Sequence, residues 1–104
     1  MIAVSPDEME IILKIIKKYV PNCDVLAFGS RLKWTHTDSS DLDLALISKN
    51  KLGISIIAQI KEDFMESDIP YKVDVLDYNA ISESFKKIID ARNFKIYEGE
   101  PHHL

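Results

Sequence analysis

Residues 28–46 read FGSRLKWTHTDSSDLDLAL, and the last third of this stretch decides the fold. Acidic and apolar residues alternate there with period two, which predicts a β-strand over residues 41–47. Because successive strand residues point to opposite faces, Asp41 and Asp43 project from one face and the leucines from the other. Strand geometry places the two aspartate Cα atoms about 6.5–7 Å apart, so both carboxylates reach one ion or a close pair of ions.

The same kind of pattern predicts the elements on either side of this strand. Ser5, Pro6 and Glu8 have the form of a capping box, which starts a helix that runs to about Tyr19. Asn79 is the expected N-cap of the last helix. The remaining expected elements are strands over 24–28, 71–77 and 94–97, a helical turn from Ser30 and a helix within 53–67. This order predicts an α/β or α+β fold, in which helices cover a small mixed β-sheet.

Length and composition limit the class of protein. With 104 residues, 46% of them hydrophobic, the chain fits a single domain over residues 1–98 followed by a flexible polar tail over 99–104. The formal charge of −4 argues against tight unaided binding of DNA or RNA. The chain has no apolar span of membrane length, and its single Cys23 is expected to be a buried structural thiol. These features predict a cytoplasmic protein.

A third carboxylate lies in the strand predicted from KVDVLD, residues 72–77. Asp74 lies between two valines and faces the side opposite to them. If this strand neighbours the 41–47 strand, Asp74 joins Asp41 and Asp43, and three carboxylates suit Mg²⁺ or Mn²⁺ better than zinc. The alternative is that these aspartates lie on a solvated strand face. Asp38 and Asp77 are interpreted as solvated or capping residues.

Gly29 and Ser30 form a turn directly after the strand predicted over 24–28. Glycine lets backbone approach a ligand closely, and exposed N–H groups with a serine hydroxyl hold phosphate oxygens. Arg31 or Lys33 adds positive charge for the same purpose. A Gly-Ser pair alone is most often an ordinary turn, but the spacing to the two acidic strands makes the combination specific.

Together these motifs, GSR, SDLDLA and KVDVLD, resemble the signature of the nucleotidyltransferase superfamily typified by DNA polymerase beta, and the short chain resembles its minimal nucleotidyltransferase (MNT) branch. The resemblance implies that Gly29 and Ser30 bind the triphosphate. It also implies that Asp41 and Asp43 hold two Mg²⁺ ions and that Asp74 completes the site near the attacking hydroxyl. One departure is Trp34, which follows Lys33 where many relatives have glycine four residues after the motif serine.

The expected activity is Mg²⁺-dependent transfer of AMP from ATP to a hydroxyl group. Minimal nucleotidyltransferases of this type are commonly paired with a helical HEPN protein, so the resemblance implies an antitoxin that adenylylates a tyrosine of a HEPN toxin. One alternative is a non-catalytic nucleotide-binding module that inhibits its partner by occupying it. Another is transfer to a small molecule such as an aminoglycoside, which usually needs an extra helical domain that this chain lacks.

Overall fold

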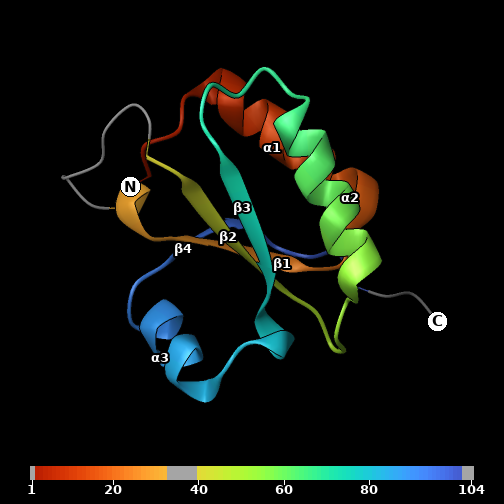
Figure 1. The fold of residues 1–104 in the computed structure, drawn as a ribbon, viewed down its shortest axis with the longest axis vertical. Coiled ribbons are helices and arrows are strands. Elements are labelled where there is room, and N and C mark those ends of the chain that lie inside the picture. The colour runs from red at the N-terminus through yellow and green to blue at the C-terminus, as the bar shows by residue number, and fades with distance from the viewer. Residues whose placement is uncertain (1, 33–39, 102–104) are drawn as a thin grey trace.

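The computed structural model describes residues 2–32 and 40–101 of the chain (Figure 1). This part of the chain contains three α-helices, four β-strands and two short 3-10 turns. In chain order they are α1 (Pro6–Tyr19), β1 (Asp24–Phe28), η1 (Ser30–Leu32), β2 (Leu42–Ile47), α2 (Ile54–Met65), β3 (Val73–Asp77), η2 (Tyr78–Ala80), α3 (Glu83–Ala91) and β4 (Phe94–Tyr97). The predicted α/β fold with a small mixed sheet is confirmed.

The four strands form one sheet in the order β3-β2-β1-β4. β1 pairs antiparallel with both β2 and β4, whereas β2 and β3 are parallel and α2 connects them. A parallel pair needs such a crossover because the chain must return to the starting end of the sheet. As a result, the end of β1 and the beginnings of β2 and β3 meet at one end of the sheet.

The larger core lies between one face of the sheet and helices α1 and α2. The predicted capping box starts α1: the Ser5 amide donates to Glu8 Oε1 at 3.0 Å and the Glu8 amide to Ser5 Oγ at 3.2 Å. Apolar residues at helical spacing line the side of each helix that faces the sheet. Fully buried members of this core are Ile12, Ile16, Val25, Leu42, Leu44, Leu46 and Ile60.

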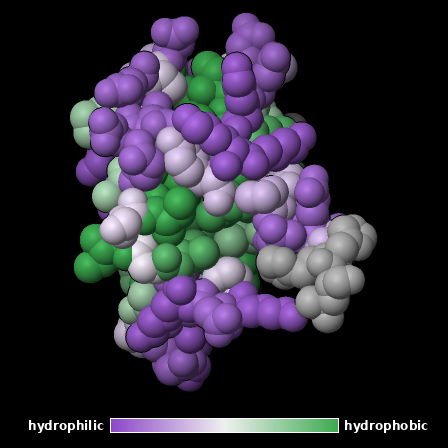
Figure 2. All heavy atoms as spheres, turned by 90° about the vertical axis from the view of Figure 1, so that its right-hand side faces the viewer, coloured by the Kyte–Doolittle hydropathy of each residue, from purple (hydrophilic) through white to green (hydrophobic). Residues whose placement is uncertain are grey.

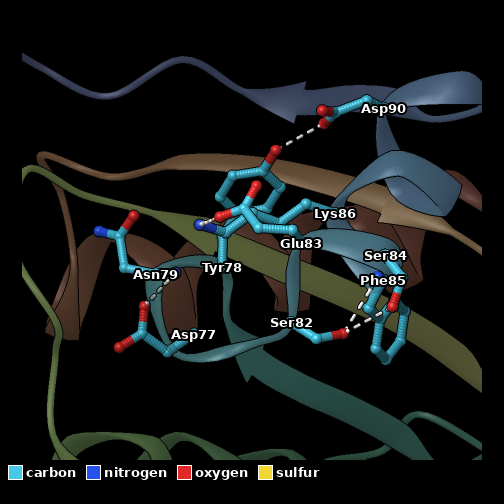
Figure 3. Close-up of polar contacts among 9 residues, drawn as sticks. All are labelled: Asp77, Tyr78, Asn79, Ser82, Glu83, Ser84, Phe85, Lys86 and Asp90. Atoms are coloured by element: carbon cyan, nitrogen blue, oxygen red, sulfur yellow. Dashed lines mark hydrogen bonds and ion pairs between the residues drawn. The ribbon is translucent and has the colours of Figure 1, made fainter.

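Helix α3 covers part of the other face, on the opposite side of the sheet from α1 and α2 (Figure 1). Its Ile89 is buried against Leu26 and Ala45. Figure 3 shows how the helix starts: Ser82 Oγ accepts the Phe85 amide at 3.2 Å, so Ser82 is the N-cap. The prediction that Asn79 caps this helix is wrong.

The physical reason is that Asp77 and Asn79 serve the turn η2 instead. The Asp77 side chain caps η2 by accepting the Asn79 amide at 3.0 Å, as Figure 3 shows. The Asn79 side chain donates to the Ser48 carbonyl at 2.7 Å. From the same turn, Tyr78 donates its hydroxyl to Asp90 of α3 at 2.7 Å. These bonds hold η2 between the sheet and the helix.

Two residues assigned by the sequence to the tail are hydrogen-bonded to the domain. The Gly99 amide donates to Asp24 Oδ1 at 2.8 Å, and the Glu100 amide donates to the Pro21 carbonyl at 2.9 Å. The chain is therefore held against the start of β1 as far as Glu100.

Candidate active site

The pairing of β2 with β3 places Asp43 directly opposite Asp74 in the parallel register. Both point to the face that α3 covers, since the neighbouring Leu42, Leu44, Val73 and Val75 all belong to the core on the α1 and α2 side. The same face continues into the small cluster under α3 through Ala45 and Leu76. The two carboxylates thus lie at the end of this face, beyond that apolar cluster.

Asp41 lies immediately before β2, which begins at Leu42 and not at residue 41 as predicted. The Leu42 amide donates to the Lys72 carbonyl at 2.9 Å, which fixes the start of the β2–β3 ladder. Asp41 is exposed, and Asp43 is partly buried. Asp41 therefore lies in the loop before β2, and Asp43 lies within the sheet.

Asp43 has a raised pKa, and burial is the largest cause. The negative charges of Asp74 and Asp41 raise the pKa further, and the positive charge of Lys72 opposes them. The structure thus brings the three predicted carboxylates close enough to repel one another. A cation at this place would relieve the repulsion.

Asp74 has its own cationic partner. Its Oδ1 lies 3.4 Å from the Nζ of Lys61 in α2, and each of the two side chains is 45% exposed. The same oxygen accepts the Val75 amide at 3.1 Å. Lys61 therefore reaches round the outer edge of β3 to the acidic face. No sequence pattern singled it out, because its spacing is that of an ordinary exposed helix residue.

Gly29 packs directly against Asp43. The antiparallel register pairs Phe28 with Asp43, so the next residue lies beside the Asp43 side chain. Gly29 has φ +86°, and a Cβ at this position would overlap Asp43 Oδ2 and lie 3.3 Å from its Cγ. Only glycine combines this backbone conformation with such a close approach. The backbone of the predicted phosphate turn therefore touches one of the predicted metal ligands.

Ser30 opens η1, and the turn is closed by the Leu32 amide, which donates to the Gly29 carbonyl at 3.1 Å. Ser30 is partly exposed beside Gly29, in the position the sequence predicted for a phosphate contact. The turn is thus open to solvent next to Asp43.

Arg31 differs from its expected role in nucleotide binding. Its side chain is only 6% exposed, and its guanidinium lies 3.5 Å from the centroid of the Tyr71 ring. Nε donates to the Ser40 carbonyl at 2.9 Å and Nη1 to the Ala3 carbonyl at 2.8 Å. These contacts join the N-terminal segment, η1 and the residues before β2. Arg31 therefore positions the turn and the acidic motif relative to each other.

The structure confirms that Asp77 is a capping residue. It is 8% exposed, and its Oδ2 accepts the Leu52 amide at 2.8 Å. Three residues with predicted roles lie outside the described residues: Lys33 and Trp34 of the phosphate loop, and Asp38, interpreted as solvated or capping.

The side chains present fit a hard divalent cation in kind, since the available donors are carboxylate oxygens. Within residues 2–32 and 40–101, however, no three His, Cys, Asp or Glu side chains are already arranged to hold one ion. In this arrangement the Asp74 carboxylate is paired with Lys61. The donors of the cluster are therefore of the kind that hard divalent cations prefer.

Comparison with known proteins gives consistent matches. A model of the family described as "Polymerase beta, Nucleotidyltransferase" matches residues 10–102 of the chain. Over 86 residues the chain is 43% identical to the probable protein adenylyltransferase MntA of Haemophilus influenzae. This alignment covers 83% of the chain and 75% of that protein.

Solved structures share the fold. One is a toxin-antitoxin crystallised with AMP-PNP, with a TM-score of 0.72 and 18% identity over 88% of this chain and 74% of that one. Another is the complex of a tri-AMPylated Shewanella oneidensis HEPN toxin with MNT antitoxin, with a TM-score of 0.68 and 18% identity over 86% and 69% of the two chains. At these identities the likeness shows the fold alone. In the described part of this chain, no helix has the length and apolar character needed to cross a membrane.

Proposed function

The chain belongs to the polymerase beta family of nucleotidyltransferases, and from this premise we propose that it transfers AMP from ATP to a hydroxyl group of a HEPN partner protein, with Mg²⁺ as cofactor. The observation that carries the proposal is the register pairing of Asp43 with Asp74, with the Gly29 backbone packed against Asp43. This arrangement joins an acidic pair to a turn suited to phosphate.

Asp41, Asp43 and Asp74 would hold two Mg²⁺ ions, or Mn²⁺ in their place. When bound, the ions stabilise the charge on the attacking and leaving oxygens and lower the pKa of the acceptor hydroxyl. Burial is the largest cause of the raised pKa of Asp43, and the charges of Asp74 and Asp41 add to it; this added repulsion supports the assignment, because a bound cation would offset it. Asp74 would exchange Lys61 for the cation as its counter-charge.

The turn at Gly29 and Ser30 would bind the β- and γ-phosphates through backbone N–H groups and the serine hydroxyl. In the reaction the acceptor oxygen forms a bond to the α-phosphorus, while the bond from that phosphorus to the bridging oxygen breaks and pyrophosphate leaves with the electron pair. The hydroxyl proton would pass to Asp74. Arg31 is part of this proposal only as the residue that positions the turn.

The proposed partner is a HEPN toxin, which adenylylation of a tyrosine would silence. Two comparisons support this: the name of the Haemophilus influenzae relative, and the fold shared with an MNT antitoxin crystallised with an AMPylated HEPN toxin. The net charge of −4 favours a protein acceptor over a polynucleotide. The reaction would occur in the cytoplasm, where ATP and Mg²⁺ are available.

The test uses α-labelled ATP, Mg²⁺ and the co-encoded HEPN protein with wild type and an Asp41→Asn, Asp43→Asn double variant. Label on the partner with wild type only is the expected result. The second candidate function, inhibition by occupancy alone, is favoured by the absence of a preformed three-carboxylate site among the described residues. No label, together with full inhibition of the partner by the double variant, would establish that alternative.

A further inference from the structure

A groove runs along the outer edge of β3, next to Asp74. It has a volume of about 420 Å³ and lies between the C-terminal half of α2 and the segment that leads into β3. Its lining includes Lys61, Met65, Ile69, Tyr71, Lys72 and Asp74. We call this surface the edge groove. Its volume falls within the range of about 300–1,000 Å³ that ligand sites occupy.

The edge groove combines apolar surface with positive charge. Met65 is 83% exposed, which is unusual for a large apolar side chain, and Ile69 and Tyr71 form part of the wall beside it. Lys61 and Lys72 supply two positive charges, and Asp74, which is paired with Lys61, supplies one negative charge. A complementary ligand therefore has an apolar side chain to cover Met65 and acidic groups to face the lysines.

The groove is also continuous with the candidate active site. Asp74 lines it and at the same time stands opposite Asp43 in the sheet. Lys61 lies in the groove and contacts Asp74. A ligand that fills the groove therefore contacts Asp74, the carboxylate proposed to accept the proton of the acceptor hydroxyl.

We propose that the edge groove docks the acceptor segment of the partner protein, a stretch in which an apolar residue and acidic residues flank the hydroxyl-bearing side chain. This inference rests on the proposed function and names the surface by which the acceptor is recognised. The apolar residue packs on Met65, the acidic residues pair with Lys61 and Lys72, and the hydroxyl reaches Asp74.

A second hollow on α2 offers a matched comparison. It has a volume of 430 Å³, includes Ile54 at the start of the helix, which is 88% exposed, and extends to Lys61, which also lines the edge groove. Figure 2, which views the molecule from the α2 side, shows an apolar area in the middle of this face with hydrophilic residues above and below. The aspartate in this hollow is the capping residue Asp77, so the hollow has no carboxylate of the candidate site.

The experiment compares Met65→Glu and Lys72→Glu with the control Ile54→Glu. Met65 and Ile54 are both exposed on α2, so neither substitution removes core packing. Binding of the HEPN partner is measured by calorimetry in an Asp43→Asn background, which separates docking from transfer, and transfer is measured with the single variants. We expect Met65→Glu and Lys72→Glu to weaken docking about tenfold or more and to raise the KM for the partner, as for a central interface residue. Ile54→Glu should dock as the parent does.

The thermal stabilisation of Met65→Glu by ATP and Mn²⁺ should equal that of wild type, because the nucleotide half of the site is untouched. Unchanged docking by Met65→Glu and Lys72→Glu would overturn the inference, and so would loss of docking by Ile54→Glu alone, which would assign the partner to the other hollow. Failure of the proposed function gives a different result: wild type would dock through the groove and leave the partner unlabelled.

Discussion

Alanine at Gly29 should cause backbone strain and also displace a predicted metal ligand. Alanine at Gly53 should cause the strain alone, so comparing the two variants separates the effects. Gly29 has φ +86° and Gly53, the N-cap of α2, has φ +89°. An alanine at either position is held in a conformation that costs about 1–3 kcal/mol. For a domain of this size each kcal/mol lowers the melting temperature by about 4–8 °C. Both variants should therefore melt at least about 4 °C below wild type in EDTA.

The two variants should differ in metal binding. A Cβ at Gly29 overlaps Asp43 Oδ2, whereas a Cβ at Gly53 has no atom within 4 Å among the described residues. The Asp43 carboxylate can escape by rotating away from the turn, which costs little stability but removes a ligand from its place. Wild type and Gly53→Ala should gain about 2.7 kcal/mol of stability when Mn²⁺ with ATP is present at 100 times its Kd, and Gly29→Ala should lose most of that gain.

Thermal unfolding of the three proteins, in EDTA and in a titration of Mn²⁺ with ATP, measures both effects. The reasoning is refuted if Gly29→Ala is stabilised by Mn²⁺ and ATP as strongly as Gly53→Ala. That result would mean that the Asp43 carboxylate does not need the space beside Gly29 in order to bind the metal.

Four further outcomes are expected. Arg31→Ala should lose about 3 kcal/mol or more in urea unfolding, and Arg31→Lys should not restore it, because two hydrogen bonds and the stacking on Tyr71 need the guanidinium. Burial raises the pKa of Glu8, but the Ser5 amide, the Tyr71 hydroxyl and Arg31 outweigh it and hold that pKa below its usual range. Ionised Glu8 therefore stabilises the fold above its unfolded pKa, and this stabilisation is lost as pH falls through its folded pKa. Melting curves between pH 3 and 7 should show this loss in wild type but not in Glu8→Gln. Burial raises the pKa of Asp43, helped by its carboxylate neighbours, so in EDTA the contribution of Asp43 to the free energy of unfolding should fall as pH rises from the normal Asp range, and Asp43→Asn should melt higher than wild type at pH 7. Burial also raises the pKa of Cys23, so iodoacetamide should alkylate it far more slowly in the native protein than in urea.

The features that the sequence predicted correctly depend on local geometry. Alternation in DLDLAL and KVDVLD sets which side chains share a face of their own strand, whatever the strand pairs with. The capping box at Ser5 and Glu8 also forms within four residues of chain. The wrong N-cap of α3 marks the limit of this reasoning, because Asn79 and Ser82 both suit the position and contacts to Ser48 and Asp77 decided between them.

The sequence by itself therefore determined the elements, the acidic face of β2 and of β3, and the need for glycine after β1. Only the tertiary structure decided that Asp43 stands opposite Asp74, because strand neighbours and register are set by packing between segments distant in the chain. It also decided where the long cations lie: Arg31 is buried on Tyr71, and Lys61 reaches Asp74. Flexible side chains of this length have no position fixed by sequence spacing, so their partners follow from the fold.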